Sequence, residues 1–288
     1  MSWTQRESQV LEEITQWEQR QFSKRGTDFT LTSHKLLNKG IQSFGDEWSK
    51  RLLLRLDDIL FYLHASLQQG SFDKRAIDNL FAQARIFRSD IYTLEDMRSL
   101  SIDQLRFIAK KQLAKQRLTA LVQGGITGLG GFLFTLSDLP LMLSINLRTV
   151  QLMAMNYGYD MRNPYEMMLV LKLFHAISLP QPLQEKAWEA LMDEAGELNE
   201  DAIFYEGEED ITSQAWLQQP LKHIAKLMAL YFLRRKTIQA IPVLGIAAGV
   251  GINYSFASHI AEASHMFYQK RFLLKKNNNE AEIPFPEN

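Results

Sequence analysis

The chain has 288 residues, of which 46% are hydrophobic and 23% are charged, and its net charge is −1. These values exclude a wholly disordered chain, and the near-neutral balance argues against a nucleic-acid-binding protein. The chain contains no cysteine, which excludes disulfides, thiolate metal sites and a cysteine nucleophile. Its first residues lack the apolar core of a signal peptide, so we expect a cytoplasmic location.

Helical spacing of apolar residues is the dominant pattern, whereas the alternating pattern of strands is scarce. In the first 117 residues, helices are predicted over residues 10–22, 52–67, 80–87 and 102–113. Ser101 and Gln104 have the spacing of a capping box at the start of the last of these helices, and Asp103 is the alternative cap. The sequence therefore predicts an all-α protein.

Two long uncharged stretches rich in small residues, 118–137 and 237–260, are the most distinctive feature of the chain. Glycine costs a helix about 1 kcal/mol relative to alanine, so clustered glycines need a compensating gain. The usual gain is the close approach of two helices, which small residues four positions apart permit. Each stretch has such a pair, Gly124/Gly128 and Gly245/Gly249. We expect a single helical domain with these two glycine-rich helices packed together at its centre.

The same two stretches are long enough to be considered as membrane spans. Their many polar and small residues make insertion energetically marginal. Basic residues precede both stretches, at Lys115 and Arg117 and again at 234–236, so the positive-inside rule gives both the same direction. Reversible contact with a membrane surface fits this pattern better than stable insertion does.

A helix-start signal follows the first glycine-rich stretch. Asp138 fits an N-cap, and Pro140 is tolerated in a first turn because its missing N–H would lack a partner there. This helix is predicted to run to Asn156 and to be ended by Gly158.

The next helix has an equally clear start. Asn163 fits its N-cap, with Pro164 as the first helical residue and Glu166 two positions later. The helix is predicted to end near Ser178, before two prolines, and a further helix is predicted over 183–195.

Charge is distributed unevenly in the last third of the chain, with a net −10 over residues 181–220 and a net +8 over residues 221–276. A basic block beside an apolar stretch is more typical of contact with an anionic membrane surface than of DNA binding. The elements predicted here are an exposed acidic loop, two long helices and a disordered tail, over residues 196–210, 211–236, 240–274 and 276–288.

Metal and nucleotide sites are the first chemistry to weigh. His259, Glu262 and His265 lie at i, i+3 and i+6, which spreads them over about 120° of a helix, whereas zinc helices favour i, i+4 pairs. An ordinary polar face is therefore the favoured interpretation. The run Gly124–Gly131 lacks the Lys-Ser/Thr of a phosphate loop and a preceding strand. No metal or other cofactor is expected.

A hydrolase or small-ligand enzyme is the alternative to a non-enzymatic protein. Its candidate residues are Asp138, Arg148 and Glu166, with His175 as a further one. Asp138 is otherwise a helix cap and Arg148 a solvated or paired side chain, and these interpretations are favoured. Glu166 and His175 are nine residues apart, so they face opposite sides of one helix and cannot form a site by themselves. The catalytic residues of any such enzyme stay unknown.

Two ordered sets of motifs resemble those of the EcsC protein family. The first set consists of Gly128, Gly130, Gly131, Asp138, Pro140, Arg148, Tyr157, Gly158, Tyr159 and Asp160. The second consists of Pro242, Gly245, Gly249, Gly251, Asn253, Tyr254, Arg271 and Phe272. The resemblance divides the chain into an N-terminal helical region, an EcsC-like core and the tail, over residues 1–90, 91–275 and 276–288.

The resemblance implies a bacterial protein whose family is named after a gene beside those of an ABC transporter, and it implies no catalytic mechanism. Together with the basic block and the glycine-rich helices, it predicts a non-enzymatic accessory protein that associates peripherally with a membrane. The expected partners are anionic lipid or a membrane protein complex, at the inner face of the membrane, and no nucleic acid. The oligomeric state is left open.

Overall fold

The computed structural model describes residues 3–23, 74–128, 134–179, 181–197 and 242–281. Within these residues the chain forms seven α-helices and one short 3-10 helix, and no strand. The prediction of a single all-α domain is confirmed. The helices are α1 (Gln5–Phe22), α4 (Lys74–Ala84), α5 (Ile102–Gly128), α6 (Phe134–Asn156), α7 (Pro164–Ser178), α8 (Gln181–Glu197) and α10 (Pro242–Ala281), and the 3-10 helix is η1 (Asp96–Ser99).

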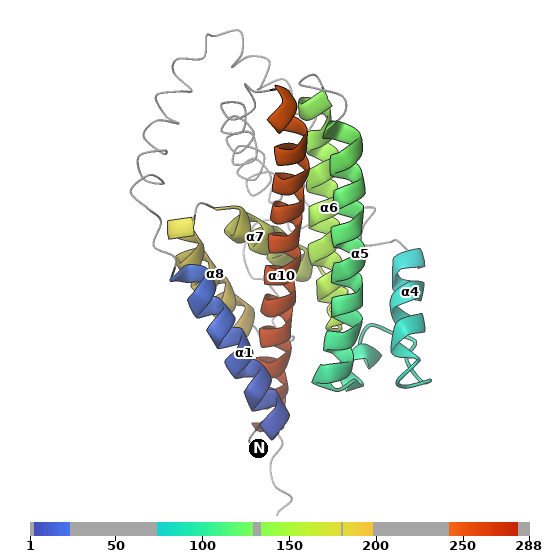
Figure 1. Ribbon diagram of the computed structural model, residues 1–288. Helices are drawn as coiled ribbons and strands as arrows, with labels where there is room; N and C mark the ends of the chain where they lie inside the picture. The colour runs from blue at the N-terminus through green and yellow to red at the C-terminus, as the bar shows by residue number, and fades with distance from the viewer. Residues whose placement is uncertain (1–2, 24–73, 129–133, 180, 198–241, 282–288) are drawn as a thin grey trace, which may run out of the picture.

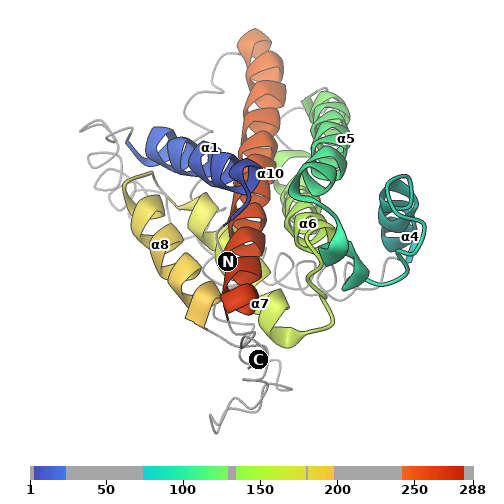
Figure 2. The ribbon, with the colours of Figure 1, turned by 90° about the horizontal axis from the view of Figure 1, so that it is seen from below.

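Helix α10 is 40 residues long and lies in the middle of the described helices. Figures 1 and 2 show α5 and α6 on one side of it and α1 and α8 on the other, with α4 outside α5, and in Figure 1 α7 crosses behind α10. Buried apolar side chains from all of these helices belong to one hydrophobic core, which includes Ile260, Phe267 and Leu273 of α10. Burial on both sides explains why α10 has apolar residues around much of its circumference.

Helix α1 is a full member of this core. Its buried side chains Val10, Ile14 and Trp17 recur at helical spacing and form one apolar face. Thr4 and Glu7 form a capping box at its start, because the Thr4 hydroxyl accepts from the Glu7 N–H and the Glu7 carboxylate accepts from the Thr4 N–H.

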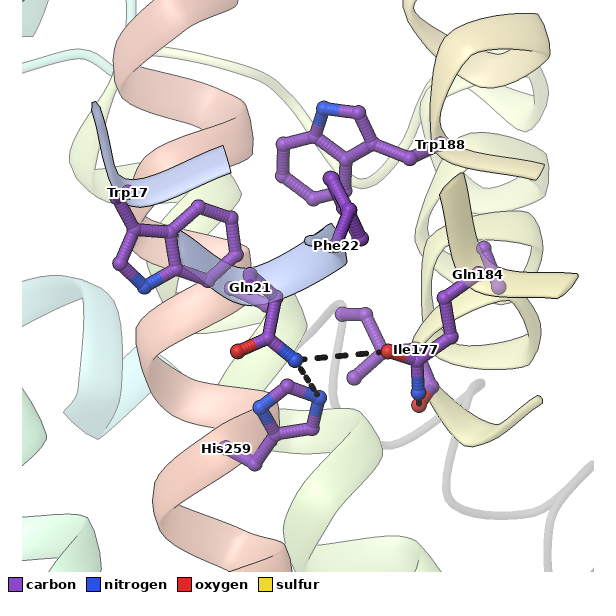
Figure 3. A pocket seen from close by; sticks show the side chains of 9 residues that line it. Trp17, Gln21, Phe22, Ile177, Gln184, Trp188 and His259 are labelled. Atoms are coloured by element: carbon purple, nitrogen blue, oxygen red, sulfur yellow. Dashed lines mark hydrogen bonds between the residues drawn. The ribbon is translucent and has the colours of Figure 1, made fainter. Parts of the chain in front are cut away.

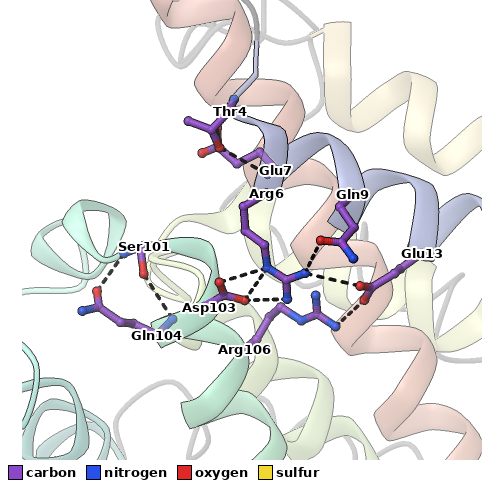
Figure 4. A network of polar contacts seen from close by, with 9 residues as sticks. All are labelled: Thr4, Arg6, Glu7, Gln9, Glu13, Ser101, Asp103, Gln104 and Arg106. Atoms are coloured by element: carbon purple, nitrogen blue, oxygen red, sulfur yellow. Dashed lines mark hydrogen bonds and ion pairs between the residues drawn. The ribbon is translucent and has the colours of Figure 1, made fainter.

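Charged side chains tie α1 to α5 (Figure 4). Arg6 donates from Nε and Nη2 to the Asp103 carboxylate at 2.8–3.0 Å. One turn further on, Arg106 donates from Nη2 to Glu13 at 2.6 Å. Ser101 and Gln104 form the predicted capping box of α5, so Asp103 is not the cap.

Two further predicted boundaries are confirmed by hydrogen bonds. The Asn163 carboxamide accepts from the Tyr165 N–H at 2.9 Å, with Pro164 as the first residue of α7. Gly158 follows the end of α6 and is the one described glycine with a positive φ, +82°. Such a conformation favours glycine.

The prediction that Asp138 caps α6 is wrong, because the helix begins at Phe134 and Asp138 is its fifth residue. Residues 134–136, which include Phe134 and Leu136, extend the helix toward the N-terminus, so the signal at Asp138 and Pro140 falls in its second turn. Pro140 cannot donate to the carbonyl of Leu136, and the helix continues through it nevertheless. The first glycine-rich stretch is therefore divided between the end of α5 and the start of α6.

The predicted disordered tail is wrong for residues 276–281, because α10 continues to Ala281. Lys276 donates to Glu7 of α1 at 2.6 Å, a contact that holds this end of α10 against the domain. Residues 282–288, the predicted helices over 52–67 and 211–236, and most of the acidic loop lie outside the described residues. Gly196, at the start of that loop, belongs to α8.

The glycines of both stretches fall outside the described side chains, so their packing against each other stays a prediction. Among the described helices, none combines the length and the apolar character needed to cross a membrane.

Candidate functional site: a buried cluster between α7 and α10

The residues of the first motif set fall into two groups. Gly128 ends α5, and Asp138 and Pro140 lie in α6, but only the backbone of these positions is described. Gly130 and Gly131 lie outside the described residues. The structure describes the side chains of the remaining members, Arg148, Tyr157, Tyr159 and Asp160, together with Gly158. Of the second set, Pro242, Gly245 and Asn253 are known by their backbone alone.

Gly158 forms the turn from α6 into α7. Its N–H donates to the carbonyl of Met155 and the N–H of Tyr159 donates to the carbonyl of Ala154, which is the Schellman pattern. A Cβ on Gly158 would lie 2.5 Å from Cγ of Arg98 and 2.9 Å from the Leu94 carbonyl oxygen. The Gly158 carbonyl accepts from Arg98 Nε at 3.1 Å. Both the positive φ and the close approach of the α4–α5 connection require glycine here.

Tyr159, directly after this turn, packs against Arg271 of α10. The Arg271 guanidinium lies 4.0 Å from the centre of the Tyr159 ring. Arg271 also donates from Nη1 and Nη2 to the two carboxylate oxygens of Glu166 at 2.6 and 2.7 Å. As whole residues, Arg271 and Glu166 are 8% and 7% exposed to solvent, so this is a buried two-point ion pair. Burial lowers the pKa of Arg271, but Tyr159 and Glu166 raise it by more, and the guanidinium stays charged.

Tyr157, directly before the glycine, makes a second buried contact with α10. Its hydroxyl is 3.0 Å from Nδ1 of His265, and its ring packs against Phe272 at 6.0 Å between centroids. Burial, with smaller contributions from Arg106 and Lys110, lowers the pKa of His265 to about 3. Burial raises the pKa of the Tyr157 hydroxyl. The pair is therefore an uncharged hydrogen bond at neutral pH.

The two motif sets therefore meet in space. Tyr157 and Tyr159 of the first set contact Arg271 and Phe272 of the second, and Tyr268 of α10 packs against Tyr159 at 5.5 Å between centroids. We call these residues, together with Glu166 and His265, the motif cluster. Its ion pair joins α7 to α10 across 105 residues of sequence. The charged groups of the cluster bond to each other, as expected of a part that holds helices together.

Comparison with known proteins agrees with the motifs. A profile of the EcsC protein family matches residues 8–273. The chain belongs to the EcsC protein family. The match begins at residue 8, within α1, whereas the resemblance in motifs begins only near residue 90. This extent agrees with the buried contacts of α1 in the common core.

Two relatives come from Bacillus subtilis (strain 168). An uncharacterized protein, YdbA, is 26% identical over 272 residues, which cover 93% of each chain. Protein EcsC is 25% identical over 202 residues, which cover 69% of this chain and 76% of the relative. No solved structure matches this EcsC-family chain.

The polar residues of α10 that suggested a metal site bond in different directions. Glu262 accepts from Trp17 Nε1 at 3.0 Å, His265 faces Tyr157, and Nε2 of His259 is 3.4 Å from Gln21 Nε2. Over the described part of the chain, no three His, Asp or Glu side chains converge in a way that could hold a metal ion. Here α10 uses its polar side chains to contact neighbouring helices.

The residues of the hydrolase alternative are not gathered at the motif cluster. Glu166 is bonded to Arg271, and His175 lies nine residues further along α7, in its last turn. Arg148 is half-buried on α6, and Asp160 bonds to Arg162 beside it in sequence. An acid–base role for Glu166 would first require the Arg271 contact to break.

A small pocket lies under the C-terminal end of α1, between α7, α8 and α10 (Figure 3). Trp17, Phe22 and Trp188 form its aromatic wall, and Gln21, Gln184 and His259 supply polar groups. The pocket has room for about one water molecule. A metabolite does not fit in this space without movement of α1.

Sequence reasoning missed the Glu166–Arg271 pair, although it named both residues for other reasons. The available signal was Arg271 itself, a charged residue followed by Phe272, Leu273 and Leu274 in an apolar helix. A charge in such a place is buried only with a partner. The identity of the partner required the fold.

Proposed function

We propose that this EcsC-family chain is a non-enzymatic accessory protein that associates peripherally with an anionic membrane surface. One observation carries the proposal: exposed apolar side chains coincide with an excess of positive charge. Such a combination binds anionic membranes through both apolar burial and electrostatic attraction.

Most of the exposed large apolar side chains among the described residues come from one stretch of the sequence. Five of the six fall between positions 86 and 118, namely Ile86, Phe87, Tyr92, Phe107 and Leu118. Residues 74–118 contain ten Lys and Arg against five Asp and Glu, a net charge of +5. Clusters of exposed apolar residues on a soluble surface mark interaction sites.

The motif cluster supports the non-enzymatic part of the proposal. Its ion pair and its tyrosine–histidine pair are buried and bonded within the cluster, which suits a structural role. A working relationship with an ABC transporter belongs to the same proposal and rests on the family resemblance alone.

Flotation of the purified full chain with vesicles tests the membrane association. We expect the protein to float with vesicles of phosphatidylglycerol in phosphatidylcholine at low salt, and to be released as the salt is raised. Vesicles of pure phosphatidylcholine should retain much less protein. Equal recovery with no vesicles, neutral vesicles and anionic vesicles would refute the proposal.

A further inference from the structure

Resting on the proposed function, we infer that the molecule docks on the anionic membrane through one exposed face of α5 and the adjoining turn after α4, with α8 turned toward water. We call this surface the α5 face and define it by Ile86, Phe87, Phe107, Lys110, Lys111 and Leu118. The occupant to which the proposal commits is a lipid bilayer with anionic headgroups.

The α5 face follows from helix geometry. Phe107 and Leu118 are eleven residues apart, which places them within about 20° of the same line and roughly 16 Å from each other. They are 56% and 61% exposed. Lys110 and Lys111 lie between them on the same side and are also exposed. The buried residues of α5, among them Leu105, Ile108, Ala109 and Leu113, occupy the opposite side.

The turn that follows α4, residues 85–87, extends the apolar part of this surface. Phe87 packs edge-to-face against Phe107, with 5.7 Å between ring centroids, and stays 36% exposed itself. Ile86 is 70% exposed. The aromatic contact holds both rings in place on the outside of the domain and leaves them accessible. Aromatic rings so presented are suited to the interface of headgroups and acyl chains.

Three of the five acidic residues in the 74–118 segment are bonded to groups nearby. Asp103 accepts from Arg6, Asp90 accepts from Arg88, and Asp96 accepts from the backbone N–H groups of Tyr92 and Thr93. These contacts occupy three of the five carboxylates, and none of them involves Lys110 or Lys111. Lys110 and Lys111 are both exposed, in a segment whose net charge is +5.

Helix α8, on the far side of α10 from α5, has the opposite character (Figures 1 and 2). It contains five acidic residues and one lysine, a net charge of −4. Glu185, Glu189 and Asp193, spaced four residues apart, are all exposed on it. A negatively charged membrane attracts the α5 face and repels α8, so the charges of these described helices favour one orientation.

Two double variants with matched changes test the face. Phe107→Gln/Lys111→Gln removes one exposed apolar side chain and one lysine from the α5 face. Leu183→Gln/Lys186→Gln removes the same two types from α8, where Leu183 is 49% exposed. We expect at least a tenfold loss of partitioning into anionic vesicles for the first variant and less than a twofold change for the second. The lysine alone should account for about fivefold.

The outcomes separate the two proposals. If the wild type floats and both variants float equally well, the α5 face is wrong while membrane association stands. If only the α8 variant is weakened, the orientation is reversed. If the wild type does not float, both proposals fail.

A measurement that does not depend on these variants uses the absence of cysteine from the chain. Ala114, which lies between Lys111 and Leu118 on the same side of α5, and Ala190 on α8 are both exposed, so each can be replaced by a single cysteine and labelled with an environment-sensitive dye. On addition of anionic vesicles, we expect a blue shift for Ala114→Cys and none for Ala190→Cys. A shift at Ala190→Cys alone would overturn the orientation. A concentration-dependent shift at Ala114→Cys without vesicles would identify a second copy of the chain as the occupant instead.

Discussion

Two arginine–carboxylate pairs join distant parts of this chain and use the same chemistry in different surroundings. Arg271 bonds to Glu166 across 105 residues, and Arg6 bonds to Asp103 across 97. Both arginines make two-point contacts at 2.6–3.0 Å. The side chains of the first pair are 10% and 9% exposed, whereas those of the second are 41% and 54% exposed.

This difference in burial decides what each pair contributes. Water solvates the Arg6–Asp103 charges whether or not they touch, so their contact adds little. The Arg271–Glu166 charges have lost their water, and each depends on the other for compensation. A pair of the second kind fixes which helices meet, because any arrangement that separates the two charges leaves one of them buried alone.

The largest expected effect is therefore at Arg271. Arg271→Met should lower the free energy of unfolding by about 3–5 kcal/mol, because Glu166 is left buried and unpaired. Urea unfolding followed by circular dichroism measures this. Glu166→Leu combined with Arg271→Met should recover most of the loss, since no charge then remains uncompensated. A loss below about 1 kcal/mol for the single variant would contradict the buried pair.

Gly158 supports the buried pair through the backbone, because the turn at this residue places Tyr159 against Arg271. Gly158→Ala should destabilise the protein by about 1–2 kcal/mol through its positive φ, and further through the contact with the Leu94 carbonyl. Gly196→Ala is the matched control, because nothing lies within 4 Å of a Cβ there and the residue is helical. The control should leave stability unchanged or raise it by less than about 1 kcal/mol. Similar losses in both variants would exclude a special role for the turn.

The neutral His265 gives the buried cluster a pH dependence between pH 7 and 5, where the exposed pair stays charged because Arg6 lowers the pKa of Asp103. The pKa of His265 is lowered to about 3 in the folded protein, so between pH 6.5 and 3 the unfolded chain binds the additional proton. Stability should thus fall as the pH drops through this window, by about 2 kcal/mol at pH 5 from this residue alone. Urea unfolding at pH 7 and pH 5 should show a smaller difference for His265→Gln than for the wild type. An equal difference would mean that His265 titrates normally.

The sequence predicted more of the fold than of the motif cluster. Apolar periodicity predicted α1. Local signals predicted α7 from its cap at Asn163, the cap at Ser101 and the end at Gly158, because these depend on neighbours within a few residues. The start of α6 was placed wrongly at Asp138. A cap signal is a local preference, and the apolar residues before it continued the helix.

The sequence indicated some residues of the motif cluster but not the contacts between them. The motifs pointed to Tyr157, Gly158, Tyr159 and Arg271, but no local pattern joins residues more than a hundred positions apart. Helical spacing correctly showed that Glu166 and His175 face opposite sides of α7. It says nothing about which helix each side meets. The sequence did not indicate the α5 face. Phe107 has the same position in the helical pattern whether its side chain is buried in a core or exposed on the surface.

The smallest expected effect is at Arg6, and it completes the comparison with Arg271. Arg6→Gln removes a two-point contact of the same geometry, yet both partners are already hydrated, so the urea midpoint should stay close to that of the wild type. Any difference should shrink further when salt is added, because exposed charges are screened. Asp103→Asn should behave in the same way, since Ser101 and Gln104 supply the cap of α5 without it. A salt-independent loss as large as that of Arg271→Met would show that this contact is excluded from water, and burial would then no longer distinguish the two pairs.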